Sequence, residues 1–202
     1  MNKRLDQIKN ENNGYLLTSE AVKQGISKQS VVNYVKTLEL EKVTNGIYVS
    51  EDVLVDNLYV TSIKNNGVII SHESALYLHG LMEKEPYINV VTVKTGYNAT
   101  HIKKRGFKVY SVIPEYFEMG TTQVITPFGN KVKCYDKERT ICDIIRNKKN
   151  IDIQVYTYAL KEYVKSKNIS LVNLMNYARI LNIEDQVRSI MELLIWLALQ
   201  HN

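Results

Sequence analysis

One stretch, residues 15–49, constrains the fold of this chain more than any other. A short helix is predicted to begin at Thr18, whose hydroxyl can cap it, and to end at Gly25. Ser27 can cap a second helix that runs from Lys28 to about Glu39. Two short helices separated by a glycine turn are typical of a helix-turn-helix.

The second of these helices is predicted to be amphipathic, and a hairpin follows it. At about 100° per residue the apolar side chains gather on one side of the helix, with polar side chains opposite. The apolar positions are Val31, Tyr34, Val35 and Leu38. Residues 40–49 then alternate around Asn45-Gly46, a pair that strongly predicts a tight hairpin. Together these elements predict a winged helix-turn-helix.

From residue 56 the pattern changes to that of an α+β domain. Strands are predicted at 68–70, 88–93, 107–113, 123–126 and 131–135, and helices at 55–65, at 72–79 (capped by Ser71), 137–147, 153–166, 170–181 and 184–199. We therefore predict two domains: a winged helix-turn-helix at 1–55 and an α+β domain at 56–202. In the second, a mostly antiparallel sheet (about 56–135) precedes helices (about 136–200).

The composition indicates an ordinary globular chain and excludes several classes of protein. Of 202 residues 45% are hydrophobic and 23% charged, which excludes a disordered or fibrous chain. No run reaches the ~20 apolar residues that a bilayer crossing needs, and the first residues contain no secretory segment. We expect a cytoplasmic protein with no membrane partner. The apolar run 190–199 is expected to be a buried helix or an interface, and Cys134 and Cys142 are expected to be reduced, packed thiols.

The helix at 28–39 carries the residues expected to bind DNA. In a helix-turn-helix this second helix enters the major groove with its N-terminal half. Gln29 and Asn33 can pair with adenine and Lys28 with guanine, while the other candidates are placed for phosphates or the adjacent backbone. The DNA-binding candidates are Lys23, Ser27, Lys28, Gln29, Ser30, Asn33, Lys36, Lys42 and Asn45. The alternative is a winged helix that binds protein, with these polar groups only solvated.

The distribution of charge supports that alternative. Residues 1–55 contain seven basic and seven acidic side chains, so the whole net charge of +5 lies beyond residue 55. Affinity through the winged helix alone should therefore be modest, and a second copy or a phosphate patch in the second domain should add to it. The candidates for that patch are Lys103, Lys104, Arg105, Lys108, Arg146, Lys148 and Lys149.

No residue pattern points to a metal ion, a cofactor or an enzyme. His72 and His79 lie two turns apart on one predicted helix, too far to share a metal ion. Asp136 is expected to cap a helix, and Asp143 to form a surface pair with either Arg146 or Arg139. A carboxylate site built from Asp136, Glu138 and Asp143 is the alternative. Phosphate-binding and nucleophile motifs are absent from the sequence.

Three blocks of sequence resemble the AbiEi-type antitoxins. They are GYLLTSEAVKQGISKQSVVNYVKTLELEKVTNGIYV (Gly14–Val49), SHESALYLHGL (Ser71–Leu81) and TPFGNKVKCYDKERTICDIIR (Thr126–Arg146). Their order and spacing cover most of the chain. Two departures stand out: relatives are often Arg-rich where this chain has Lys28, Gln29 and Asn33, and the segment after residue 150 matches no motif.

The resemblance implies an antitoxin of a type IV toxin–antitoxin system that aborts phage infection. Its partners would be double-stranded operator DNA, with two copies on inverted repeats, and a nucleotidyltransferase-like toxin that it opposes without a stable complex. The winged helix would repress the operon, and the second domain would supply antitoxin activity. The motif residues that match are His72, Glu73, Asp136, Glu138, Arg139 and Asp143. The other functions left open are a transcriptional regulator with a ligand-sensing domain and a helix-turn-helix fused to a nuclease-like domain.

Overall fold

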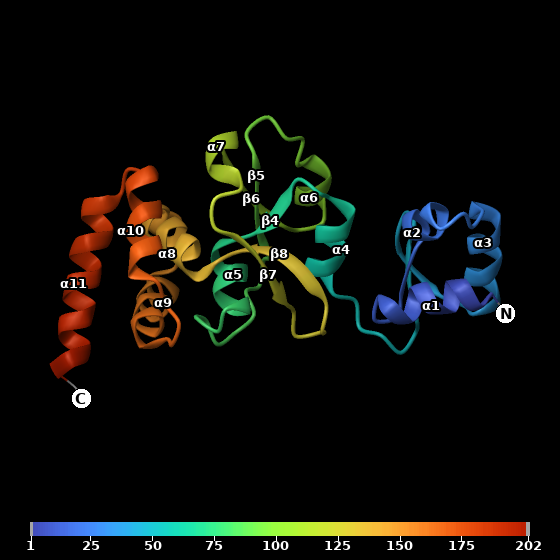
Figure 1. The fold of residues 1–202 in the computed structure, drawn as a ribbon, viewed down its shortest axis with the longest axis horizontal. Coiled ribbons are helices and arrows are strands. Elements are labelled where there is room, and N and C mark those ends of the chain that lie inside the picture. The colour runs from blue at the N-terminus through green and yellow to red at the C-terminus, as the bar shows by residue number, and fades with distance from the viewer. Residues whose placement is uncertain (1, 201–202) are drawn as a thin grey trace. The chain divides into compact units, whose positions relative to one another are not determined.

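The computed structural model describes residues 2–200, apart from the side chains of Ala198 and Leu199. The chain is α+β, as predicted, and Figure 1 shows its elements in order. Its contacts divide it into two compact units. Unit 1 comprises Met1–Val60 with Thr126–Asn130, and unit 2 comprises Thr61–Ile125 with Lys131–Asn202.

Unit 1 contains the predicted winged helix-turn-helix. Its elements are α1 (Lys3–Glu11), β1 (Tyr15–Leu17), α2 (Thr18–Lys23), α3 (Lys28–Thr37), β2 (Glu41–Thr44) and β3 (Ile47–Val49). The hairpin of β2 and β3 turns at Asn45-Gly46, as predicted, and β1 pairs antiparallel with β3 to give the order β1-β3-β2. The sequence showed β1 only as a short apolar step, because three residues are too few to reveal an alternating pattern.

The predicted caps have different outcomes. Ser27 caps α3, since its Oγ accepts a hydrogen bond from the backbone N–H of Ser30 at 3.1 Å. Thr18 is not a cap but the first residue of α2, and its N–H donates to the carbonyl of Gly46 at 2.9 Å. Pairing of Leu17 with Ile47 keeps the preceding residue extended, so the helix starts directly at the end of the strand.

The core of unit 1 forms where the amphipathic pattern placed it. Val31 and Tyr34 of α3 are buried, with Val35 and Leu38 packed against them. The buried residues of this cluster are Leu5, Ile8, Leu16, Ala21, Ile26, Val31, Tyr34 and Leu40. Packing of α1, α2 and α3 around one core holds the polar side of α3 outward.

Unit 1 also takes in the turn of a distant hairpin, Thr126–Asn130, through the buried carboxylate of Asp56. Asp56 Oδ2 accepts hydrogen bonds from Thr126 Oγ1 at 2.6 Å and from Asn130 Nδ2 at 2.9 Å. Its Oδ1 accepts one from the N–H of Tyr59 in α4 (Asn57–Lys64) at 3.0 Å. Asn13 Nδ2 adds a bond to the carbonyl of Gly129 at 3.1 Å. Unit 1 therefore includes residues beyond 55, where the sequence suggested a boundary.

Unit 2 is built on a five-stranded mixed sheet in the order β6-β5-β4-β8-β7. Its strands are β4 (Val68–Ile70), β5 (Val90–Lys94), β6 (Lys108–Val112), β7 (Thr121–Ile125) and β8 (Lys131–Tyr135). The β4–β5 and β7–β8 pairs are antiparallel, whereas β4–β8 and β5–β6 are parallel. The expectation of a mostly antiparallel sheet was therefore wrong. The connection from β5 to β6 passes through α6 (Thr100–Lys104), and such a crossover permits parallel pairing.

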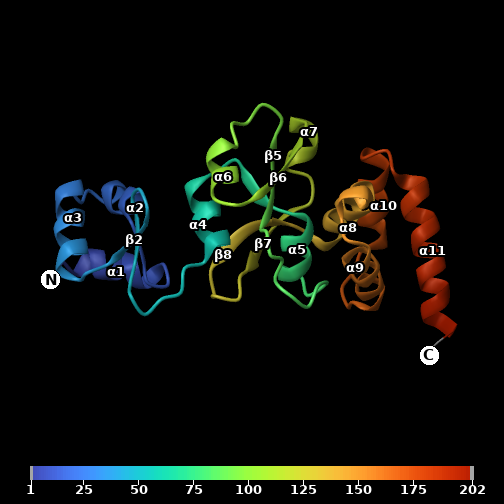
Figure 2. The same cartoon turned by 180° about the vertical axis from the view of Figure 1, so that it is seen from behind.

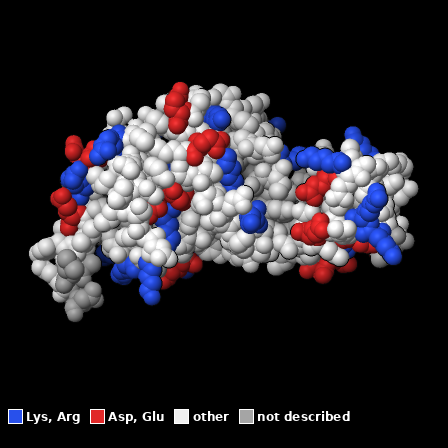
Figure 3. Space-filling model, viewed as in Figure 1, with Lys and Arg blue, Asp and Glu red and all other residues white. Residues whose placement is uncertain are grey.

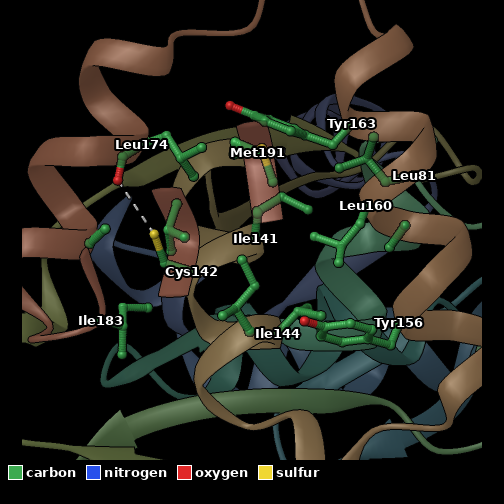
Figure 4. Packing of buried hydrophobic residues seen from close by; sticks show 14 of the residues in the cluster. Leu81, Ile141, Cys142, Ile144, Tyr156, Leu160, Tyr163, Leu174, Ile183 and Met191 are labelled. Atoms are coloured by element: carbon green, nitrogen blue, oxygen red, sulfur yellow. Dashed lines mark hydrogen bonds between the residues drawn. The ribbon is translucent and has the colours of Figure 1, made fainter. Parts of the chain in front are cut away.

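The helices predicted in unit 2 are present in the predicted order, but the short helices at 100–104 and 114–117 were not predicted. Figures 1 and 2 show the last four helices gathered beside the sheet. The helices of unit 2 are α5 (His72–Leu78), α6, α7 (Pro114–Phe117), α8 (Lys137–Arg146), the 3-10 turn η1 (Lys148–Asn150), α9 (Ile153–Lys165), α10 (Leu171–Ile180) and α11 (Glu184–Gln200). Figure 4 shows their apolar core, in which Cys142 Sγ donates to the carbonyl of Leu174 at 3.6 Å. Both cysteines are free and buried, as expected.

The last helix, α11, is only half buried. Val187 and Met191 lie in the core, but the side chains of Leu193 and Trp196 are 57% and 55% exposed. Of the two alternatives predicted for the apolar run 190–199, a fully buried helix does not hold for the described side chains, and an interface stays a prediction. The side chains of Ala198 and Leu199 lie outside those described. Within residues 2–200 no helix has the length and apolar character needed to cross a membrane.

Candidate nucleic-acid interface

The exposed side of α3 presents a hydrogen-bonded pair of amide side chains. Gln29 Nε2 donates to Asn33 Oδ1 at 3.0 Å, one helical turn along. Thr37 Oγ1 donates to the backbone carbonyl of Asn33 at 3.0 Å. Gln29 and Asn33 are both exposed, as are Lys28 and Lys36 on the same helix. The capped start of α3 thus carries a polar surface with a fixed orientation.

This pairing changes how the two amides can contact a base. With Asn33 Oδ1 already accepting from Gln29, its second lone pair and the Nδ2 hydrogens remain for the N6 and N7 atoms of an adenine. Gln29 then orients Asn33, whereas the sequence suggested two independent base contacts. The spacing of four residues was the signal that could have shown the pairing in advance.

The remaining DNA-binding candidates also lie in unit 1 and differ in exposure and in whether they cap α3. Lys23 and Lys42 are exposed, and Asn45 is exposed at the tip of the hairpin. Ser27 and Ser30 are joined through their hydroxyl oxygens at 2.9 Å, so both take part in the cap of α3. A helix cap places them beside any phosphate that approaches the start of the helix.

Two acidic residues of unit 1 lie near the C-terminal end of α3. The unit contains seven basic and eight acidic side chains, and the face in Figure 3 shows both signs interspersed. Glu51 and Asp52 line a hollow of about 520 Å³ together with Leu38 and Leu40, which follow the C-terminal end of α3. These two carboxylates lie at the opposite end of α3 from Lys28, in a hollow that Lys9 also lines.

The residues proposed as a second phosphate patch fall into two groups in unit 2. Lys103, Lys104 and Arg105 are exposed at the end of α6. Lys108 instead donates to the carbonyl of Asn150 at 3.2 Å and pairs with Glu73 Oε1 at 3.5 Å. Lys108 is thus tied to the second group, which consists of Arg146, Lys148 and Lys149. These three residues line one hollow, and Lys108 does not.

The acidic motif at the start of α8 holds helices together. Asp136 caps α8 by accepting from the N–H of Arg139 at 2.7 Å, as predicted, and its Oδ2 accepts from Tyr177 of α10 at 2.9 Å. Glu138 Oε1 accepts from Tyr163 of α9 at 3.3 Å and from the N–H of Ser170 at 2.7 Å. Burial raises the pKa of Asp136. Apart from the cap bond within α8, these contacts join the start of α8 to α9 and α10.

Arg139 is the centre of this network, and the expected surface pair is buried. Its Nε donates to Asp143 Oδ2 at 3.1 Å, with both side chains almost fully buried. The NH1 group donates to the carbonyls of Tyr116 at 2.6 Å and Met119 at 2.9 Å, and the guanidinium lies 4.3 Å from the ring centre of Tyr135. The expectation failed because a spacing of four residues gives the pairing but not the side of the helix that faces the core.

His72 occupies a strained and fully buried position. Its φ is +50°, in the left-handed region that few residues other than glycine adopt, and its ring stacks on Tyr110 with centres 3.8 Å apart. Asn147 Nδ2 donates to His72 Nε2 at 3.1 Å, which leaves Nδ1 to donate to Ser71 Oγ at 3.0 Å. Ser71 was predicted to cap α5, but no side-chain capping bond forms, because its hydroxyl accepts from Thr92 Oγ1 as well.

His79 also makes a structural contact, and the described residues contain no metal-binding cluster. His79 Nε2 donates to the carbonyl of Tyr135 at 2.7 Å. Across residues 2–200, no three His, Cys, Asp or Glu side chains lie close enough together to hold a metal ion.

The buried imidazole of His72 should make unit 2 sensitive to acid. Burial, followed by the charges of Lys108 and Arg139, lowers the pKa of His72 to about 3. An unfolded chain takes up this proton near pH 6.5, so stability is complete above that pH and falls as the pH drops toward 3. We expect a loss of about 2 kcal/mol between pH 7 and pH 5 in urea unfolding followed by Trp196 fluorescence.

A pair of variants isolates this effect. Asparagine tolerates the left-handed backbone and does not titrate, so His72→Asn should reduce the dependence on pH. Part of the dependence should remain, because burial also lowers the pKa of His79. His101→Asn, at an exposed position, should leave it unchanged. An equal slope in wild type and His72→Asn would contradict the assignment.

Comparison of the sequence and structure with known proteins supports the fold assignment. No protein-family model and no curated protein matches the chain. Among solved structures it is similar to the RV2827C protein from Mycobacterium tuberculosis, with a TM-score of 0.58 and 10% sequence identity. The match covers 87% of this chain and 69% of that one. At such low identity it shows the fold alone.

Proposed function

We propose that this protein is a DNA-binding regulator whose α3 enters the major groove of an operator. The observation that supports this most strongly is the Gln29–Asn33 pair, held outward on the helix that Ser27 caps. A helix in this position contacts bases with its N-terminal half while other residues hold phosphates. A winged helix that only binds protein would not need this paired, adenine-compatible arrangement of amides.

The finer part of the proposal is that the protein is an antitoxin that represses its own operon. Its support is the resemblance of three sequence blocks, in order, to the AbiEi-type antitoxins. In this proposal unit 1 binds inverted repeats upstream of the gene, and unit 2 opposes a nucleotidyltransferase-like toxin without a stable complex. The protein would carry out no catalysis itself.

Replacing Lys28, Gln29 and Asn33 together with alanine should weaken operator binding by at least about 100-fold, since each lost bidentate contact costs ~1–3 kcal/mol. Affinity for unrelated DNA should fall only a few-fold, because phosphate contacts are mostly retained. Fluorescence anisotropy with the upstream inverted repeats and with a scrambled duplex measures both. In cells, the same variant should lose repression yet still rescue growth from the toxin.

A matched control lies in the same unit. Lys3, Gln7 and Asn10 are the same three residue types, all exposed on α1. The Lys3→Ala, Gln7→Ala, Asn10→Ala variant should bind the operator like the wild type. Equal weakening by the two triple variants, or no weakening by the first, would refute the role of α3.

A further inference from the structure

Unit 2 contains a hollow of about 730 Å³ beside the C-terminal end of α8. It is lined by the last residues of α8, by η1, by Tyr156 of α9 and by the first turns of α11. Lys108 donates to the carbonyl of Asn150 at 3.2 Å and so ties η1 to β6. The rim formed by η1 is therefore attached to the sheet.

The hollow has an excess of positive charge. Arg146, Lys148 and Lys149 line it, and none of them forms an ion pair with a carboxylate within residues 2–200. Asp185 is the single carboxylate among the lining residues. Three cations around one carboxylate favour an anionic occupant, and adjacent lysines with an arginine are suited to phosphate.

A purely structural explanation covers only part of this cluster. Arg146 lies in the last turn of α8, where a cation is stabilised by the helix dipole. Lys148 and Lys149 lie beyond α8, in the 3-10 turn η1, where both are exposed at the hollow.

The remaining lining suits an organic group attached to the phosphate. Ile190 is half-buried and supplies apolar surface, and the largely buried Ile145 and Tyr156 form the floor beneath it, with Lys148 Nζ 5.1 Å from the ring centre of Tyr156. Gln186 offers an exposed amide that can pair with the edge of a base. The volume is within the range of about 300–1,000 Å³ usual for small-molecule sites and exceeds what inorganic phosphate would fill.

We propose that this hollow binds a nucleotide, with its phosphates at Arg146, Lys148 and Lys149 and its base near Ile190 and Gln186. This site is independent of the operator contacts on α3. It would give the regulator a means of responding to a nucleotide through unit 2. A nucleic-acid strand carries the same phosphate and base chemistry, so the experiment includes duplex DNA as a separate ligand.

Isothermal titration of the full chain with ATP, GTP, CTP, UTP and pyrophosphate tests the proposal. At least one nucleotide should bind saturably and more tightly than pyrophosphate. The Lys148→Gln, Lys149→Gln variant should weaken that binding by about tenfold or more, because two charged hydrogen-bond donors to phosphate are lost. Gln186→Ala should weaken nucleotide binding but leave pyrophosphate binding unchanged.

Matched controls keep these outcomes separate from folding and from operator binding. Lys103 and Lys104 form an equivalent exposed pair outside the hollow, so Lys103→Gln, Lys104→Gln should bind nucleotide like the wild type. The triple variant of α3 should also bind nucleotide normally, even where it no longer binds the operator. No saturable binding, equal affinity for pyrophosphate, equal loss in both lysine pairs, or binding of duplex DNA alone at the hollow would each overturn the proposal.

Discussion

Replacing Arg139 with alanine should lower the free energy of unfolding of unit 2 by about 3–5 kcal/mol, the usual cost of removing one partner from a buried ion pair. The side chain is fully buried, and its loss leaves Asp143 with an uncompensated charge. It also removes the donor to the carbonyls of Tyr116 and Met119. Urea unfolding followed by Trp196 fluorescence, which reports on α11 of the same unit, measures the change.

Two further variants define the cause. Arg188 also forms an ion pair four residues from its partner, Glu184, but the arginine is 55% exposed, so Arg188→Ala should cost less than about 1 kcal/mol. Replacing Arg139 with methionine and Asp143 with leucine removes both charges and should recover part of the loss. A loss below about 1 kcal/mol in Arg139→Ala would show that the buried pair does not stabilise the unit.

Replacing Asp56 with alanine should destabilise unit 1 by about 4 kcal/mol or more, since three hydrogen bonds to a charged group are lost and each contributes ~1.5–3 kcal/mol. The carboxylate accepts hydrogen bonds from Thr126, Asn130 and the N–H of Tyr59. In the alanine variant these three donors would lose their acceptor. Hydrogen exchange of the full chain should show faster exchange at residues 56–60 and 126–130. Circular dichroism during thermal unfolding gives the loss of stability.

The matching variants separate the carboxylate from its charge. Asparagine retains one acceptor oxygen, so Asp56→Asn should lose about half as much stability as Asp56→Ala. Asp52→Ala removes an exposed carboxylate from the same unit and should leave exchange at residues 126–130 unchanged. Unchanged exchange there in Asp56→Ala would contradict the role of Asp56 in holding this turn.

The candidate site was predictable where it depends on local pattern. The exposure of Gln29, Asn33 and Lys28 follows from the amphipathic period of α3, and the cap at Ser27 from a short polar side chain before a helix. The hollow with Arg146, Lys148 and Lys149 was not predictable, although the cluster of charge was visible. Part of its wall comes from α11, which is distant in sequence from α8, and no local pattern encodes that proximity.

The sequence by itself determined the kind, order and approximate limits of most helices and strands, because periodicity, caps and turn residues act over a few neighbouring positions. The tertiary structure alone decided which strands pair in parallel, that Arg139 and Asp143 face the core, and that the turn at 126–130 binds Asp56. These features depend on burial and hydrogen bonding between segments far apart in the chain. Such contacts form only when whole elements pack together.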